Sequence, residues 1–151
     1  MKYINELLDN RTLFAACTAW FTAQFIKIII NLIEEKRIDF RLIMSSGGMP
    51  SSHSATVCAL CVMILRLCSA SSVQFATAVV FAFIVMYDAA GVRRAAGEQA
   101  KVLNKIVEDL SKGKTEYMEK NLKELIGHTP FQVAMGFVLG VAVAAAMFFI
   151  M

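Results

Sequence analysis

Residues 131–151, FQVAMGFVLGVAVAAAMFFIM, decide the fold class because they form a long apolar run without one charged side chain. A helix needs about 20 mostly apolar residues to cross the hydrocarbon core of a bilayer. Inside that core the backbone has to satisfy its own hydrogen bonds, which a helix does. This run therefore predicts a transmembrane helix.

Three more segments have the same character, at about 13–33, 51–67 and 73–90. The segment at 51–67 is short and carries Arg66 near its end, where the side chain can extend to the interface. The chain is 58% hydrophobic and 18% charged. In soluble domains roughly half of the residues are apolar and about a quarter are charged. We predict one all-α membrane domain over residues 1–151, an integral membrane helical bundle of about four transmembrane helices.

A polar insert at about 95–126 separates the third and fourth predicted spans. Its first part places four apolar residues on one helical face, and a second short helix follows the turn at 111–114. These four residues are Leu103, Ile106, Val107 and Leu110. We interpret the insert as amphipathic helices on the membrane surface or, alternatively, as a helix pair folded over a functional site.

The basic residues are distributed unevenly between the two sides of the predicted bundle. Four spans place only Lys2, Arg11 and Arg66 on the side of the two termini. The other side holds the basic residues Lys36, Arg37, Arg41, Arg93, Arg94, Lys101, Lys105, Lys112, Lys114, Lys120 and Lys123. Because cytoplasmic loops carry an excess of Lys and Arg, we expect a multi-pass protein of the plasma (inner) membrane with this side in the cytoplasm.

Both histidines lie where a span begins on that cytoplasmic side. His53 lies in the stretch GGMPSSHS at 47–54, and His128 lies in GHTP at 127–130. Helix starts attract anions through free N–H groups and the positive end of the helix dipole. Pro50 and Pro130 are expected in the first turns of these helices, where a missing N–H costs little.

Charged side chains from the other spans are expected at the same membrane level. Asp88 lies at the end of the third span and is followed by Arg93 and Arg94. Two helix starts, two histidines and several arginines favour a phosphoryl-transfer site, with one histidine as nucleophile and the other as acid. The alternative is that both histidines only cap helices or line interfaces. Asp88 has its own alternative, an ion pair that only holds helices together.

Lys27 lies inside the first span, where a charged residue is expensive and indicates function. Trp20, Gln24, Lys27 and Asn31 recur at helical spacing, so they form one stripe that we expect to face the bundle. The alternative is that the Lys27 side chain extends to the headgroups.

Gly136 and Gly140 form a G-x-x-x-G pattern, which lets helices approach closely. It indicates a homodimer face or packing within one subunit, and we favour the second. Cys58 and Cys61 form a C-x-x-C inside a span, where we expect buried, inert thiols. No nucleic-acid-binding motif is present.

Taken together, these residues resemble the divergent family related to type 2 phosphatidic acid phosphatases. The resemblance covers most of the chain and includes matching residues within 19–27, the stretches 47–55, 87–94 and 122–130, Gly97 and Leu103-Asn104. It implies that Pro50-Ser51-Ser52-His53 corresponds to a P-S-G-H motif, with His53 as general acid and the backbone of Ser51 and Ser52 binding phosphate.

The same resemblance implies that His128 is the nucleophile, with Gln132 where the superfamily has an aspartate. Asp88 and Glu124 are the candidates to orient His128. The superfamily's other basic positions are not kept, and Lys27, Arg41, Arg93 and Arg94 are the candidate replacements. Thr129 completes the predicted phosphate-binding set.

The resemblance implies a lipid phosphatase that forms a phosphohistidine at His128 without a metal or cofactor. Expected substrates in the bilayer are phosphatidylglycerophosphate, phosphatidic acid or an isoprenyl pyrophosphate. The alternatives are a non-catalytic protein that binds or moves lipids, and a metal site built from His53, His128 and Asp88. Haloperoxidase activity is not expected, because that chemistry is associated with larger soluble relatives.

Overall fold

The computed structural model describes residues 2–36, 48–110 and 127–150, and every element in these ranges is a helix. The helices are α1 Lys2–Leu8, α2 Arg11–Glu35, α3 Ser52–Leu67, α4 Val73–Ala90, α5 Val92–Leu110 and α6 Pro130–Ile150. The all-α fold class is therefore confirmed. The predicted spans agree with α2, α3, α4 and α6 to within two residues at each end.

Among the described residues, three helical stretches are long and apolar enough to cross a membrane, namely Arg11–Glu34, Val73–Glu108 and Pro130–Ile150. Helix α3 has 16 residues, which is shorter than the roughly 20 that a full crossing needs. The prediction of about four membrane helices therefore agrees with the structure, which has three long apolar helices and one shorter one.

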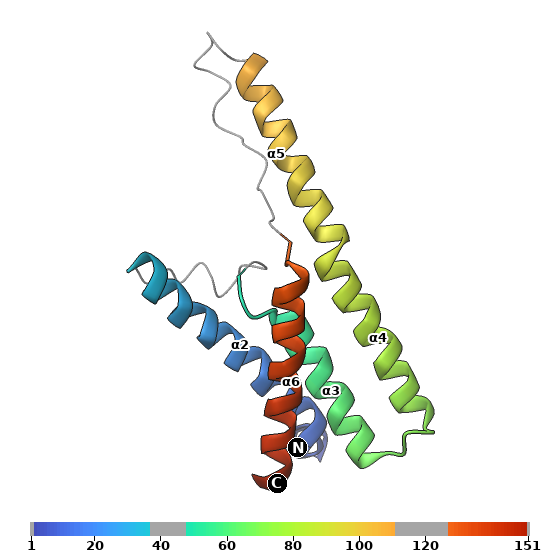
Figure 1. The fold of residues 1–151 in the computed structure, drawn as a ribbon. Coiled ribbons are helices and arrows are strands. Elements are labelled where there is room, and N and C mark those ends of the chain that lie inside the picture. The colour runs from blue at the N-terminus through green and yellow to red at the C-terminus, as the bar shows by residue number, and fades with distance from the viewer. Residues whose placement is uncertain (1, 37–47, 111–126, 151) are drawn as a thin grey trace.

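The helices run up and down, so that both chain ends and the α3–α4 turn lie at one end of the bundle (Figure 1). Helix α3 packs against α2, α4 and α6. The core at these contacts consists mostly of alanines, which let helices approach closely. They are Ala15, Ala19 and Ala23 of α2, Ala55 and Ala59 of α3, and Ala144 of α6.

Gly136 and Gly140 face α3 of the same chain. A Cβ on Gly136 would lie 2.4 Å from the Ser51 oxygen, and one on Gly140 would lie 2.3 Å from the Ala55 oxygen. Packing within one subunit is therefore the role that the structure shows for this G-x-x-x-G. A homodimer through Gly136 and Gly140 would require α3 to leave this face.

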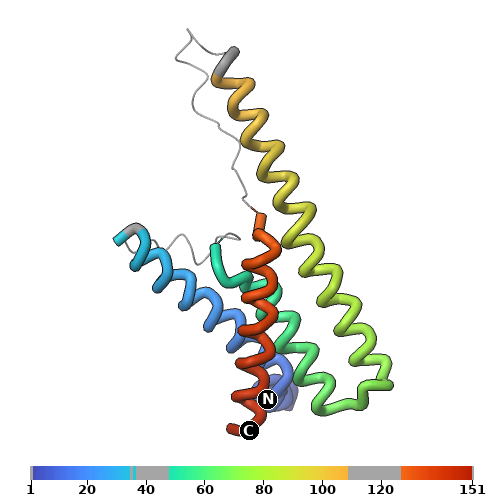
Figure 2. Tube along the Cα trace, viewed as in Figure 1, coloured from blue at the N-terminus to red at the C-terminus, as the bar shows by residue number. Residues whose placement is uncertain are grey.

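Helix α5 continues the line of α4 beyond the start of α6, with Gly91 at the junction (Figure 2). It begins at Val92, three residues earlier than predicted. Its apolar face, including Leu103, Ile106 and Val107, is exposed. Since α5 follows α4, it neither folds over the start of α6 nor turns to lie across the bundle. The predicted turn at 111–114 and the second short helix lie outside the described residues.

The two prolines take different places at their helix starts. Pro130 is the first residue of α6, as predicted. Pro50 lies two residues before α3, because Ser51 is the N-cap and its side chain accepts a hydrogen bond from the Ser54 N–H. The prediction that Pro50 lies in the first turn was therefore wrong.

Candidate functional site

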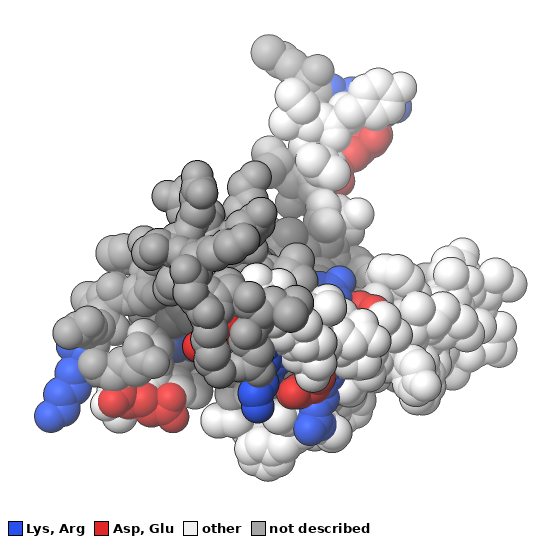
Figure 3. Space-filling view, turned by 90° about the horizontal axis from the view of Figure 1, so that it is seen from above, with Lys and Arg blue, Asp and Glu red and all other residues white. Residues whose placement is uncertain are grey.

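Four parts of the chain meet at the end of the bundle opposite the termini. They are the second half of α2, the start of α3, the end of α4 and the segment before α6. Seen from above, Lys and Arg side chains lie beside Asp and Glu side chains at this end (Figure 3). The structure thus brings residues far apart in the sequence to one level of the bundle.

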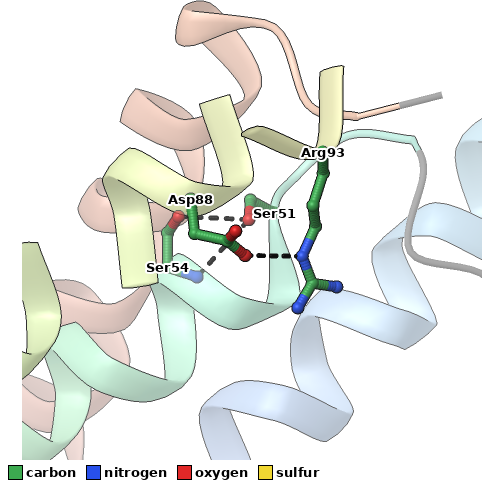
Figure 4. Close-up of polar contacts among 4 residues, drawn as sticks. All are labelled: Ser51, Ser54, Asp88 and Arg93. Carbon is green, nitrogen blue, oxygen red and sulfur yellow. Dashed lines mark hydrogen bonds and ion pairs between the residues drawn. The ribbon is translucent and has the colours of Figure 1, made fainter. Parts of the chain in front are cut away.

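The start of α3 is held by hydrogen bonds among buried serines. Ser51 Oγ accepts from the Ser54 N–H at 3.4 Å and from Ser54 Oγ at 3.1 Å (Figure 4). The Ser51 N–H donates to the Gln132 backbone oxygen at 3.0 Å. Because Ser51 caps only one of the first N–H groups, others at this helix start remain available to an anion.

The two histidines lie side by side, with ring centroids 6.2 Å apart. His128 is only 1% exposed, and its backbone N–H donates to the Ala89 oxygen at 3.1 Å. His53 Nδ1 and His128 Nε2 are buried and have no hydrogen-bond partner among the described residues. A buried ring nitrogen without a partner costs free energy, which a ligand can recover by binding there.

Gly127 allows the segment before α6 to lie directly against the junction of α4 and α5. A Cβ on Gly127 would lie 2.2 Å from the Arg94 backbone nitrogen and 2.5 Å from the Arg94 Cα. These are backbone atoms that cannot swing aside, so only glycine fits. This close approach of Gly127 positions His128, the next residue.

Lys27 lies inside the bundle and is 3% exposed. Its Nζ donates to Ser52 Oγ at 3.4 Å, which links α2 to the start of α3. Gly48 has a positive φ of 85°, and a Cβ there would lie 3.7 Å from the Lys27 side chain. Extension of Lys27 to the headgroups is therefore not what the structure shows. Gln24, on the same stripe, is buried as well.

Asp88 forms an ion pair with Arg93, with 2.7 Å between the Asp88 carboxylate and Arg93 Nε (Figure 4). Arg93, Lys27 and Asp88 are all close enough to interact electrostatically with His53. The structure thus shows Asp88 in an ion pair with an arginine, at the junction of α4 and α5. The Arg94 side chain is exposed, and its contact with this region is through its backbone.

The surroundings of His128 hold its imidazole in the neutral form. Burial lowers the pKa of His128 from its usual value to about 4, and the positive charge of Lys27 acts in the same direction. His53 and Arg93 lower this pKa further, whereas the hydrogen bond with Gln132 raises it. At neutral pH His128 is therefore uncharged and has a free lone pair, as a nucleophile requires.

Gln132, at the position where the resemblance implied an aspartate, contacts the His128 ring. Its Oε1 lies 3.4 Å from His128 Nδ1 and accepts from the Thr129 N–H at 3.0 Å. The Gln132 N–H in turn donates to Thr129 Oγ1 at 3.3 Å. This reciprocal pair is a capping box. The sequence T-P-F-Q at 129–132 carries that signal, which the sequence analysis missed.

Other predicted site residues take different places. Asp88 does not contact His128 in the structure, because its carboxylate is paired with Arg93. Thr129 is exposed and caps α6. Arg41 and Glu124 lie outside the described residues. Within residues 2–36, 48–110 and 127–150, no three His, Cys, Asp or Glu side chains are arranged to hold a metal ion.

An apolar groove of about 210 Å³ lies between α3, α4 and α6 on the membrane side of this site. Its lining includes Cys58, Met86 and Phe137. Met86 lies three residues before Ala89, whose carbonyl holds the His128 backbone. With a rise of about 1.5 Å per residue, the groove begins roughly one helical turn from the histidines.

Comparison with known proteins gives the chain its family. The sequence pattern of the Divergent PAP2 family matches residues 8–143. The chain is also 42% identical over 146 residues to the uncharacterized membrane protein YuiD of Bacillus subtilis (strain 168). That alignment covers 90% of this chain and 92% of the relative. No solved structure matches. The chain is thus an integral membrane protein that belongs to the Divergent PAP2 family, as its resemblance had implied.

Proposed function

We propose that this protein is a membrane lipid phosphatase that hydrolyses a lipid phosphate monoester or pyrophosphate through a phosphohistidine at His128. The observation that carries the proposal is the pair of buried ring nitrogens, His128 Nε2 and His53 Nδ1, which lack partners among the described residues. They belong to rings 6.2 Å apart, close enough for both to reach one phosphoryl group. The family name supports the same class of chemistry.

In the first step, His128 Nε2 attacks phosphorus, and the bond between phosphorus and the lipid oxygen breaks. His53 gives a proton to the leaving lipid oxygen as general acid. Water then attacks phosphorus and loses a proton to His53, and the bond between phosphorus and His128 Nε2 breaks. Inorganic phosphate leaves, and both histidines return to their starting state.

We assign three groups to the binding of the phosphoryl oxygens. Lys27 supplies a buried positive charge beside Ser52, and the start of α3 supplies free N–H groups. Arg93 lies near both histidines and adds a second charge as the transition state forms. Asp88 positions Arg93 through their ion pair.

The groove below the histidines supports a lipid as the substrate rather than a soluble phosphate ester. It is lined by apolar side chains, and an apolar space of this size excludes water and accepts apolar groups. A lipid phosphate with its phosphate at His128 would place its tail in this groove. The excess of Lys and Arg supports a cytoplasmic site and substrates of the inner leaflet, such as phosphatidylglycerophosphate or phosphatidic acid.

The test is phosphate release by the purified protein in detergent from a panel of lipid phosphates. The panel contains phosphatidylglycerophosphate, phosphatidic acid and an isoprenyl pyrophosphate. His128→Ala and His53→Ala are compared with wild type, and Thr77→Val, an exposed site on α4, is the matched control. We expect release from wild type and the control only. Equal release from all four proteins, or from none, would end the proposal.

One observation favours a second function, a non-catalytic protein that binds or moves lipid phosphates. Gln132 is uncharged, so it does not stabilise an imidazolium at His128 as an aspartate would. This alternative predicts that phosphatidic acid binds wild type and His128→Ala equally, with no phosphate released by either. Lys27→Met would weaken that binding, because the buried positive charge is lost.

A further inference from the structure

The contacts of Gln132 define the chemistry of His128 further than the family relation does. Gln132 Oε1 accepts a hydrogen bond from the Thr129 N–H at 3.0 Å. A backbone N–H only donates, so the side-chain atom at this point has to be the carbonyl oxygen and not the amide nitrogen. The same oxygen lies 3.4 Å from His128 Nδ1. Because this oxygen only accepts, Nδ1 has to carry the proton.

In a neutral imidazole, one nitrogen carries the proton and the other the lone pair. With the proton on Nδ1, the lone pair is on Nε2. That nitrogen is buried and has no hydrogen-bond partner among the described residues. Its lone pair is therefore not engaged by any of these residues and is available to a phosphorus atom.

Gln132 also ties the nucleophile to the phosphate-binding helix start. Its backbone oxygen accepts from the Ser51 N–H at 3.0 Å, while its side chain holds His128 and Thr129. One residue thus connects the segment before α6 with the cap of α3. A shift of Gln132 would change the distance between His128 and the helix start that is proposed to bind the phosphate.

We propose that Gln132 is the positioning residue of His128, and that it fixes the Nδ1–H tautomer so that phosphorylation occurs on Nε2 alone. The consequence for catalysis rests on the proposed phosphatase function, whereas the tautomer does not. Because Gln132 is uncharged, it orients the ring without favouring the imidazolium. An aspartate or glutamate at this position would orient the ring and also favour its charged form.

The tautomer is tested by nitrogen-15 NMR of the full-length protein in detergent with labelled histidine. The chain has two histidines, so His53→Ala assigns the His128 signals. We expect the Nδ1–H form in wild type and in Gln132→Glu, which keeps the accepting oxygen. In Gln132→Met, which has similar length and no strong acceptor, the Nε2–H form should appear.

A control separates this role from simple capping. Thr129→Val removes the hydroxyl that accepts from the Gln132 N–H but keeps the contact between Gln132 and His128. If Gln132 only stabilised α6, Thr129→Val and Gln132→Met would change the histidine signals alike. We expect only Gln132→Met to change the tautomer, and an unchanged tautomer in Gln132→Met would overturn the inference.

Turnover gives a second readout with phosphatidic acid as substrate. Gln132→Met should lower kcat about tenfold, the effect of one lost hydrogen bond at the reacting group, with KM changed less than about twofold. Gln132→Glu should keep most of kcat. As the pH is lowered, this variant should lose activity at a higher pH than wild type does, since a carboxylate favours the charged ring. The trapped phosphohistidine should be the Nε2 isomer in both wild type and Gln132→Glu.

The outcomes separate this inference from the proposed function. An Nδ1–H tautomer that depends on Gln132, without any phosphoenzyme, would support the inference and contradict the phosphatase. A phosphoenzyme on Nδ1, or a wild-type ring in the Nε2–H form, would overturn the inference and the attack by Nε2, but lipid phosphate hydrolysis through a phosphohistidine at His128 would stand.

Discussion

The two helix starts that form the site hold their histidines in different ways. His53 lies inside the first turn of α3, so its backbone is fixed by the helix and by the Ser51 cap. His128 lies two residues before α6, and its backbone is held from outside by the Ala89 oxygen. Its ring is held by Gln132. A histidine that precedes its helix depends on contacts with several elements, whereas a histidine within a helix depends mainly on that helix.

This difference also agrees with the roles proposed for the two histidines. His128 is almost completely buried, and its pKa of about 4 keeps it neutral. His53 is only partly buried, so the attacking water can reach it and give up its proton in the second step. A neutral, buried nucleophile and a more accessible acid are what the proposed reaction requires.

The largest expected effect is the loss of activity in the two histidine variants. Comparing substrates with different leaving groups distinguishes the nucleophile from the acid. With phosphatidic acid, His128→Ala should lower kcat/KM by about 10³-fold or more, and His53→Ala by about 10²-fold or more. With p-nitrophenyl phosphate, whose leaving group needs no proton, His53→Ala should recover to within about tenfold of wild type. His128→Ala should not recover. Recovery by His128→Ala instead would reverse the two assignments.

The next effect tests whether the His128 segment depends on contacts from outside. Gly127→Ala forces a Cβ against the Arg94 backbone, so the segment has to move by a substantial fraction of an ångström. Such a displacement should lower kcat about 10²-fold. Gly91→Ala is the matched control at the same junction, since its Cβ would meet the Tyr87 oxygen at 3.0 Å. Equal activity in both variants would show that the segment is not held there.

Lys27 affects both histidines, and its removal should appear in the pH profile. Lys27→Met should lower kcat/KM about tenfold, because one charge on the phosphoryl oxygens is lost. Lys27 also lowers the pKa of His128, so its removal raises that pKa above about 4. Since only neutral His128 attacks, the acid side of the profile should move to higher pH. An acid side that does not move would mean that Lys27 does not act on His128.

The smallest effects should come from the glycines that join α6 to α3. Gly136→Ala and Gly140→Ala create similar clashes, at the Ser51 and Ala55 oxygens. Each should cost about 1–3 kcal/mol of stability, measured by thermal unfolding in detergent. Only Gly136→Ala lies beside the cap of α3, so it should also lower activity, several-fold more than Gly140→Ala. Equal activity losses would indicate a general effect of helix packing.

Much of the fold follows from local features of the sequence. Helix α4 has the bounds that were predicted for the span at 73–90. Its ends are marked in the sequence, because serines precede the apolar run and a glycine follows it. The structure turns at Ser69–Ser72, between the predicted spans at 51–67 and 73–90. The direction of α5 could not be predicted, because neither its amphipathic pattern nor Gly91 determines whether the helix bends away from α4.

In the site, too, some residues could be predicted from the sequence and others could not. The sequence indicated Lys27, His53 and His128 because charged and titratable groups in an apolar chain are rare and expensive. It pointed to Asp88 as a catalytic group, since an acidic residue near histidines suggests a partner. The structure pairs Asp88 with Arg93 and gives the contact with His128 to Gln132. Sequence distance does not reveal which of two polar residues reaches a given ring.

The sequence by itself determined that this is a helical membrane protein, where its helices lie and which polar residues share one end of the bundle. Those properties depend on hydropathy, helix caps and the order of the spans, all of which are local. Only the tertiary structure decided that Gly136 and Gly140 face α3, that Gly127 fits against Arg94 and that Gln132 holds His128. These contacts depend on how closely two helices approach and on the rotation of each about its axis, which the packing of the whole bundle sets.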